Sequence, residues 1–149
     1  MRRKTAEHLV ALYSALSGLN EEALKMLGSV YADSVEYYGK LLSRDEVVMQ
    51  TARFNERWPL RQHKPRARSV EIHCDVATLS CMAGGTLDFD ARSPARNEHS
   101  FGAATFEYTF NYALSPGIPK ITKENGSVVE RHKQSLAPRI PVWDQHMPR

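Results

Sequence analysis

The sequence lacks most of the short motifs that identify common enzyme classes. It contains no phosphate-binding loop, no dinucleotide-binding glycine motif and no nucleophile elbow. Its two cysteines do not have the spacing of a zinc site, and none of its six histidines pairs with another at metal-ligand spacing. We therefore expect no metal and no cofactor. We interpret the histidines as surface or edge residues: His8, His63, His73, His99, His132 and His146.

Long apolar runs and a large excess of one charge are also missing. No segment approaches the roughly 18 consecutive apolar residues of a membrane span. Glu7 and His8 interrupt the N-terminal stretch that otherwise resembles a signal peptide, so we expect a cytoplasmic protein. The net charge of +3 is too small to indicate nucleic-acid binding. With 149 residues, 42% of them hydrophobic, the chain suits one globular domain.

The most basic segment covers residues 61–68. It contains Pro65 and no interleaved aromatic residue of the kind on which nucleic-acid bases stack. Charged residues and proline are typical of edge strands, where they oppose pairing with another sheet. We interpret the segment as a solvated edge strand, and a nucleic-acid groove is the alternative.

Helical spacing of apolar residues predicts three helices, near residues 5–17, 20–27 and 43–58. In the third helix, Ser43 followed by Glu46 matches the capping box, and Pro59 ends the helix. In the second helix, Asn20 predicts the start and Gly28 the end. The buried face of the third helix is expected to carry Val47, Thr51, Phe54 and Trp58.

Alternation of apolar and polar residues predicts an antiparallel sheet of four to six strands in addition to the helices. The clearest strand spans residues 104–112, where one face is almost entirely aromatic. Because the helices come first and most of the strands follow, the fold class is α+β. We also expect a first strand from residue 29 or 30 to 38, a bulge at Gly84-Gly85, a polar loop over residues 88–97 and a hairpin turn at Glu124-Asn125-Gly126.

The two cysteines flank a predicted turn. Cys74 and Cys81 are placed symmetrically about Ala77-Thr78, so a tight hairpin would put them opposite one another, within disulfide range. In a cytoplasmic protein we expect them to stay reduced and to act as small apolar residues.

One stretch resembles a known superfamily. Tyr31-Ala32-Asp33, followed by Val35-Glu36-Tyr37-Tyr38-Gly39, is similar to the signature of the nuclear transport factor 2-like superfamily, which includes ketosteroid isomerases and SnoaL-type cyclases. The order of elements extends the resemblance over about residues 4–133. It implies a cone-shaped, curved antiparallel sheet wrapped over three helices, in a single domain of residues 1–133. Residues 88–97 and Phe106-Glu107-Tyr108 also look similar to uncharacterised bacterial members.

The resemblance also bears on catalysis. The isomerases use a carboxylate base at the end of the first strand, an acid pair in the oxyanion hole and a tyrosine from the first helix. The matching positions in this chain are Tyr37 for the base and Phe106 for the oxyanion carboxyl, and only Tyr13 survives. Because proton abstraction needs a base of suitable pKa, this departure weakens the isomerase interpretation, and we assign no catalytic residue.

The four elements that line the cone in this superfamily carry an aromatic cluster in this chain. We predict either a hydrophobic core or an apolar, tyrosine-lined ligand pocket, in which the tyrosine hydroxyls orient the ligand. The expected function is a non-catalytic ligand-binding or protein-interaction domain. The alternative is a SnoaL-like isomerase, dehydratase or cyclase that uses Asp33, Glu36, Asp88 or Tyr13. The predicted pocket residues are Tyr13, Val35, Tyr37, Phe54, Trp58, Phe106 and Tyr108.

Two further expectations concern partners. Members of the superfamily commonly pair through the open sheet face, so we expect a homodimer that uses Thr105, Glu107, Thr109 and Asn111. The proline-rich residues 134–149 are expected to form an extended tail, either flexible or held against a partner surface through Trp143.

Overall fold

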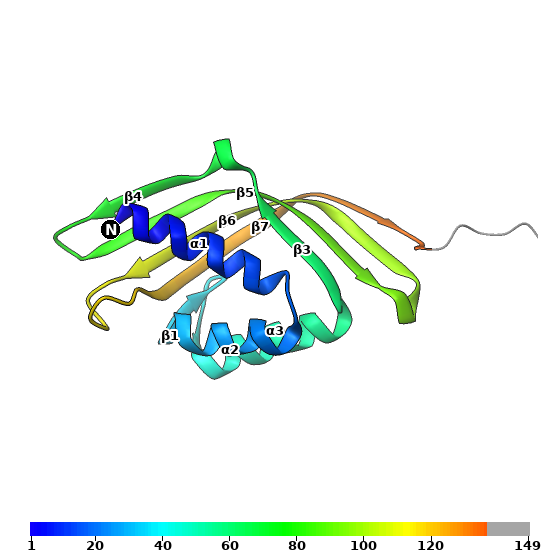
Figure 1. The fold of residues 1–149 in the computed structure, drawn as a ribbon, viewed down its shortest axis with the longest axis horizontal. Helices are drawn as coiled ribbons and strands as arrows, with labels where there is room; N and C mark the ends of the chain where they lie inside the picture. Colours follow the sequence, from blue (N-terminus) through cyan, green and yellow to red (C-terminus); the bar gives the residue numbers. More distant parts are fainter. Residues whose placement is uncertain (137–149) are drawn as a thin grey trace, which may run out of the picture.

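A single mixed sheet of seven strands arches over three helices in the computed structural model, which describes residues 1–136 (Figure 1). The strands lie in the order β2-β1-β7-β6-β5-β3, with β4 paired to β5, and the sheet does not close. Trp143 and its predicted partner contact lie outside the described residues. The helices are α1 (Arg2–Leu16), α2 (Asn20–Val30) and α3 (Arg44–Arg57). The strands are β1 (Tyr31–Tyr37), β2 (Lys40–Ser43), β3 (Leu60–Pro65), β4 (Glu71–Asp75), β5 (Ser80–Ser93), β6 (Glu98–Asn111) and β7 (Lys120–Gln134), with short 3-10 turns at η1 (Ala67–Ser69) and η2 (Pro94–Arg96).

The α+β cone predicted from the sequence is confirmed, with two corrections to its sheet. The strands number seven rather than four to six, and β1 pairs in parallel with β7, whereas the other pairs are antiparallel. Most of the chain separates β1 from β7, so no tight turn dictates their relative direction.

The third helix forms as its local signals indicate. The Ser43 hydroxyl accepts a hydrogen bond from the Glu46 backbone N–H at 3.2 Å, and the Glu46 carboxylate accepts one from the Ser43 N–H at 3.3 Å. This capping box satisfies two backbone donors that the first turn would otherwise leave unpaired. Trp58 is the C-terminal cap, directly before Pro59. The buried residues of the helix are Val47 and Asn55, whereas Phe54, which the sequence predicts on the buried face, is 44% exposed, so the buried face is turned toward Asn55.

The second helix differs from the prediction at both ends. Leu19 is the N-cap residue, and Asn20 lies inside the helix, where its side-chain oxygen accepts a hydrogen bond from Arg61. The helix also continues through Gly28 to Val30. Glycine costs only about 1 kcal/mol in a helix, and burial of the neighbouring Leu27 holds the last turn in place.

The glycine pair in β5 does not form a bulge. β5 and β6 pair without a register shift, and the inward residues Cys81, Ala83 and Leu87 are all buried. A Cβ on Gly85 would lie 3.0 Å from the Ser69 carbonyl oxygen, so glycine allows close packing there. The register shifts of the sheet lie elsewhere, between Ala103 and Ala104 and between Thr109 and Phe110 where β6 pairs with β7, and between Tyr31 and Glu36 in β1.

Two predicted turns are strand instead. Most of the polar run of residues 88–97 belongs to β5, because it pairs with β3 on one side and with β6 on the other. The Asn125-Gly126 pair lies within the continuous strand β7, opposite Glu107 and Phe106. A Cβ on Gly126 would lie 2.3 Å from the Thr105 carbonyl oxygen. The long ladder with β6 therefore overrides the local turn preference of Asn-Gly.

The aromatic face of β6 is confirmed as the centre of the core. Phe106, Tyr108 and Phe110 are all at most 5% exposed, and they lie against the helices on the concave side of the sheet. Burial of apolar side chains such as these is the dominant favourable contribution to folding. The same core contains Leu9, Leu12, Leu27, Val35, Val47 and Ile121.

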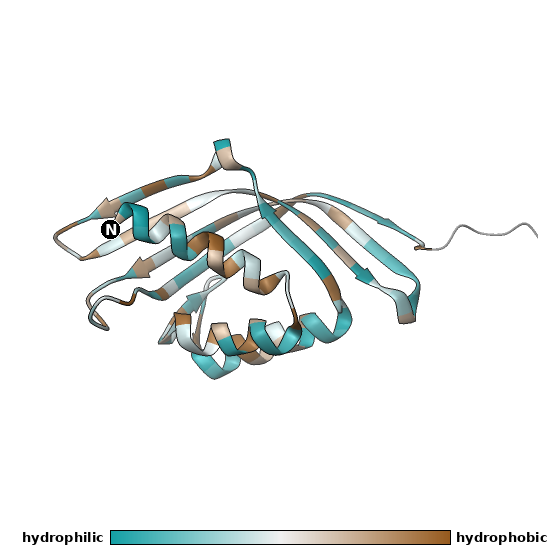
Figure 2. Cartoon of the chain, viewed as in Figure 1, coloured by the Kyte–Doolittle hydropathy of each residue, from teal (hydrophilic) through white to brown (hydrophobic). Residues whose placement is uncertain are grey.

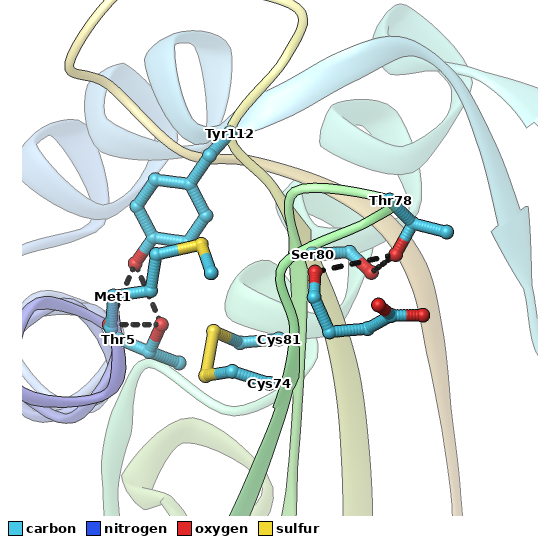
Figure 3. The surroundings of a disulfide bond; sticks show 8 residues. Met1, Thr5, Cys74, Thr78, Ser80, Cys81 and Tyr112 are labelled. Carbon is cyan, nitrogen blue, oxygen red and sulfur yellow. Dashed lines mark hydrogen bonds between the residues drawn. A yellow bond between two sulfur atoms is a disulfide. The ribbon is translucent and has the colours of Figure 1, made fainter.

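The cysteines face each other across β4 and β5, as predicted, but they are bonded. Cys74 is the register partner of Cys81, and the two form a disulfide beside the first turn of α1 (Figure 3). The expectation of free thiols was wrong, because direct opposition in a hairpin places the sulfur atoms within bonding distance. Thr5 lies at the same place, and its hydroxyl shares a hydrogen bond of 2.6 Å with the Tyr112 hydroxyl.

β3 is an edge strand, as predicted, and it is mostly hydrophilic along its length (Figure 2). The expectation that its charges are solvated fails at Arg61, which is only 7% exposed. The Arg61 guanidinium donates hydrogen bonds to the carbonyl oxygens of Leu16, at 3.0 Å, and Gly18, at 3.2 Å. A cation that binds the last carbonyls of a helix stabilises its negative end, so Arg61 anchors α1 to the edge of the sheet.

Candidate functional site

A cavity of about 700 Å³ lies between the concave face of the sheet and the helices. Six of the seven predicted pocket residues line it: Tyr13, Tyr37, Phe54, Trp58, Phe106 and Tyr108. Val35 does not line it and is fully buried in the core. That these side chains bind a ligand stays a prediction.

The most unusual group in the cavity wall is Glu124, on β7 opposite Tyr108. The Tyr31 hydroxyl donates a hydrogen bond to its Oε1, and the Tyr38 hydroxyl donates one to Oε2 at 3.1 Å. The residue is only 7% exposed. Burial raises the pKa of Glu124 to about 7, although the two tyrosine hydrogen bonds act in the opposite direction. The carboxyl therefore exchanges a proton within the physiological pH range.

Tyrosine hydroxyls surround this carboxyl. Burial, and then the charge of Glu124, raises the pKa of Tyr31, Tyr37, Tyr38 and Tyr108 above the ordinary value. Burial is also the main cause of the raised pKa of Tyr13, whose ring packs against Phe106 at 5.4 Å. All of these hydroxyls stay protonated at neutral pH, so they are hydrogen-bond donors rather than bases.

The carboxylates considered from the sequence are not in the cavity wall. Asp33, Glu36 and Asp88 are exposed. Asp33 pairs with Arg44 at 3.3 Å, and Asp88 pairs with Arg66. Of the candidates for the enzymatic alternative only Tyr13 lines the cavity, and the carboxylate that lines it, Glu124, had been assigned to a hairpin turn.

His63 lies on the edge strand β3, as expected, but its side chain lines the cavity. Its ring lies 6.4 Å from that of Tyr13 and 6.3 Å from that of Phe54. Burial and then the nearby charge of Arg61 lower the pKa of His63 to about 4. The imidazole is therefore neutral at physiological pH and offers one donor and one acceptor nitrogen.

The α3 side of the cavity is polar. Thr51 and Asn55 lie one helical turn apart and line the cavity together with Arg57. Arg131 and Lys133, both exposed, line it from β7. Within residues 1–136, no three His, Cys, Asp or Glu side chains cluster closely enough to hold a metal ion. No helix in that range is long and apolar enough to span a membrane.

No protein-family model matches the chain, and no curated protein matches its sequence. Solved structures do match. A scytalone dehydratase-like protein from Novosphingobium aromaticivorans superposes with a TM-score of 0.72 at 10% identity, over 94% of this chain and 91% of that one. The hexachlorocyclohexane dehydrochlorinase LinA-type3 from Novosphingobium barchaimii gives a TM-score of 0.68 at 17% identity, over 94% and 97%.

A third match decides the fold. A dehydratase-like protein from Streptomyces avermitilis, of the nuclear transport factor 2-like family, superposes with a TM-score of 0.70 at 15% identity, over 86% of this chain and 96% of that one. This chain has the nuclear transport factor 2-like fold. Within this nuclear transport factor 2-like cone, the cavity with Glu124 lies on the concave side of the sheet. At such low identities the likeness establishes the fold alone, and function is argued from the site.

Proposed function

We propose that the chain is a small-molecule isomerase or lyase in which Glu124 transfers a proton to and from a carbon atom of the substrate. One observation carries the proposal: a buried carboxyl with a pKa of about 7 lies in the wall of a cavity beside several aromatic side chains. A general base works best when its pKa lies near the operating pH, and burial among apolar groups is how proteins raise a carboxyl to that range. The dehydratase and dehydrochlorinase names of the structural neighbours agree with this reaction class.

The proposed step is proton abstraction beside a carbonyl group. Ionised Glu124 takes the proton from carbon, the C–H electron pair forms a C=C bond, the π pair of the carbonyl moves onto its oxygen, and an enolate results. Tyr13 and Tyr37, which line the same cavity and stay protonated, are suited to donate hydrogen bonds to that oxygen. Return of the proton at another carbon gives isomerisation, and departure of a β-substituent gives elimination.

Deuterium exchange tests this step without knowledge of the natural substrate. In D₂O, NMR would follow exchange at the α-carbon of a panel of cyclic ketones and β-hydroxy ketones. We expect exchange with the wild-type protein, at a rate that rises with pH through about 7 because the base must be ionised. Glu124→Gln should reduce the rate about 10²-fold or more.

Glu36→Gln is the matched control, because Glu36 is an exposed glutamate on the neighbouring strand β1. It should leave the rate unchanged. Equal rates for the wild type and Glu124→Gln, or no exchange with any compound that binds, would contradict the proposal.

A second candidate is a non-catalytic ligand-binding domain, and one observation favours it. Each carboxylate oxygen of Glu124 already accepts a hydrogen bond from a tyrosine hydroxyl. This arrangement stabilises a buried carboxylate whether or not the protein catalyses a reaction. This candidate predicts saturable binding of small apolar compounds with no exchange at carbon.

We also propose a homodimer through the outer sheet face. The three helices lie on the concave side (Figure 1), and Thr105, Glu107 and Thr109 are half-buried or exposed on the other. Light scattering at high micromolar concentration should give twice the monomer mass, and a monomer there would refute this proposal.

A further inference from the structure

Asn55 carries a buried donor that the protein does not use. The residue is 2% exposed, and its Nδ2 has no hydrogen-bond partner within residues 1–136. Leaving a buried amide donor unpaired costs about 1–3 kcal/mol, so such groups are rare in native proteins and call for an explanation. Asn55 lines the cavity, and a ligand atom there would supply the missing acceptor.

Arg57 has a second buried donor in the same condition. Its Nη2 bonds to Glu98, and its guanidinium carbon lies 4.3 Å from the centroid of the Trp58 ring. Its Nη1 is buried and has no partner in the described part of the chain. The guanidinium is thus held in place by Glu98 and Trp58 while one N–H group stays available. Arg57 lines the same cavity as Asn55.

The position of Asn55 relates it to the proposed acid-base group. Thr51, Asn55 and Trp58 line the cavity at spacings of four and three residues, so they share one face of α3. Asn55 lies about 6 Å along the helix from Thr51. Burial and then the charge of Glu124 raise the pKa of the Tyr37 hydroxyl, whereas a hydrogen bond with Thr51 lowers it. Asn55 and the tyrosine cluster around Glu124 therefore line the same cavity at different positions.

Charge indicates what that group is. The two unused groups are both donors, so they require an acceptor, and Arg57 is also a cation. Arg131 and Lys133 add positive charge from β7 at exposed positions of the same cavity. A carboxylate is a charged acceptor that suits either an amide or a guanidinium donor, and aromatic side chains such as Phe54 and Trp58 line other parts of the cavity.

We infer that the ligand of this cavity is a cyclic or aromatic carboxylate whose carboxylate group accepts a hydrogen bond from Asn55, with the positive charge of Arg57 on the same cavity wall. The inference rests on the proposed function, because it names the substrate class of that site. Its apolar ring would lie among the aromatic side chains, and the reacting carbon would face Glu124. The negatively charged end would then lie at a different part of the cavity wall from the carboxyl that must ionise.

Binding of 2-naphthoate, measured by calorimetry, tests the inference, with the neutral 2-naphthamide as the matched probe. We expect 2-naphthoate to bind at least about tenfold more tightly, the difference that a hydrogen bond to a charged group produces. Asn55→Leu should weaken 2-naphthoate binding about tenfold or more. It should also leave the melting temperature of the free protein unchanged or raised, since it removes an unpaired buried donor.

Asn125→Leu is the control, because Asn125 is exposed on β7 and does not line the cavity. It should leave the affinity unchanged. Asn55→Leu that lowers the melting temperature and keeps the affinity would show that Asn55 is structural, and this result overturns the inference. Equal affinity for the amide and the carboxylate, or no binding of 2-naphthoate at millimolar concentration, overturns it as well.

The failure of this inference can be told apart from the failure of the proposed function. Glu124→Gln should still bind 2-naphthoate, because Glu124 contributes nothing to the carboxylate subsite. Tight carboxylate binding without deuterium exchange at carbon would support the subsite and refute the catalytic proposal. Exchange that depends on Glu124 but shows no preference for carboxylate substrates would support the catalytic proposal and refute the carboxylate subsite.

Discussion

Replacement of Glu124 by glutamine should change how the stability of the protein depends on pH. The ordinary pKa of the carboxyl is 4.5, and in the folded protein it is about 7. Between these values the folded chain holds a proton that the unfolded chain releases, so stability is full below about pH 4.5 and falls as pH rises toward 7. At 1.36 kcal/mol per pKa unit the loss amounts to about 3 kcal/mol.

Glutamine imitates the protonated carboxyl and does not titrate. We therefore expect the free energy of unfolding of Glu124→Gln, relative to wild type, to increase by about 3 kcal/mol between pH 4.5 and 8. Urea unfolding at several pH values measures this difference. Subtracting the wild type cancels the contributions of other titrating groups, such as His63, whose pKa is shifted downward.

The control is Glu36→Gln, which removes an exposed carboxyl from the surface. Its difference from wild type should vary little with pH. A Glu124→Gln difference that is flat over the same range would refute the reasoning, because it would mean that the buried carboxyl titrates near its ordinary value and cannot act as a base poised near neutrality.

Three further predictions concern stability. The wild type should lose stability as pH falls from about 6.5 toward 4, because the buried imidazole of His63 resists protonation. Replacing His63 by glutamine should abolish this loss, and acid unfolding midpoints of the two proteins measure the difference. Gly126→Ala should destabilise the protein by about 1–3 kcal/mol, because the new Cβ clashes with the Thr105 backbone. Gly28→Ala should stabilise it by about 0.5–1 kcal/mol, because the new Cβ meets nothing within 4 Å. Equal melting temperatures for the two variants would contradict the β7 register. Arg61→Ala should lower the free energy of unfolding by about 2–3 kcal/mol, because it leaves carbonyl oxygens at the end of α1 without their donor. Arg68→Ala, at an exposed position, should change it very little, and a chemical denaturation curve for each variant measures the difference.

Local signals were sufficient wherever a feature depends on neighbours in the sequence. The capping box of Ser43 and Glu46 defines the start of α3 because both partners lie within one helical turn. The alternation around Phe106, Tyr108 and Phe110 identifies the core strand because successive side chains of a strand point to opposite faces. These features, together with the order of elements and the superfamily resemblance, were enough to predict the cone and six of the residues that line its cavity.

Features that depend on distant partners were not readable in this way. Asn125-Gly126 is a hairpin signal in isolation, yet the ladder with β6 keeps it in a strand. Gly28 is a helix stop in isolation, yet packing carries α2 past it. In both cases the long-range pairing or packing contributes more free energy than the roughly 1 kcal/mol of the local preference.

The candidate site shows most clearly the difference between features set by sequence neighbours and features set by distant partners. Ile121 faces the core, so alternation along β7 would turn Lys123 inward and Glu124 outward. The register shift opposite Thr109 and Phe110 adds one residue to β7, and this reverses the faces and buries Glu124 beside Tyr31. The sequence by itself determined the aromatic strand and the capped helix, because alternation and capping are local, and its resemblance to the superfamily implied the cone. Only the tertiary structure decided which carboxyl enters it, because a one-residue shift in strand pairing moves every following side chain to the other face of the sheet.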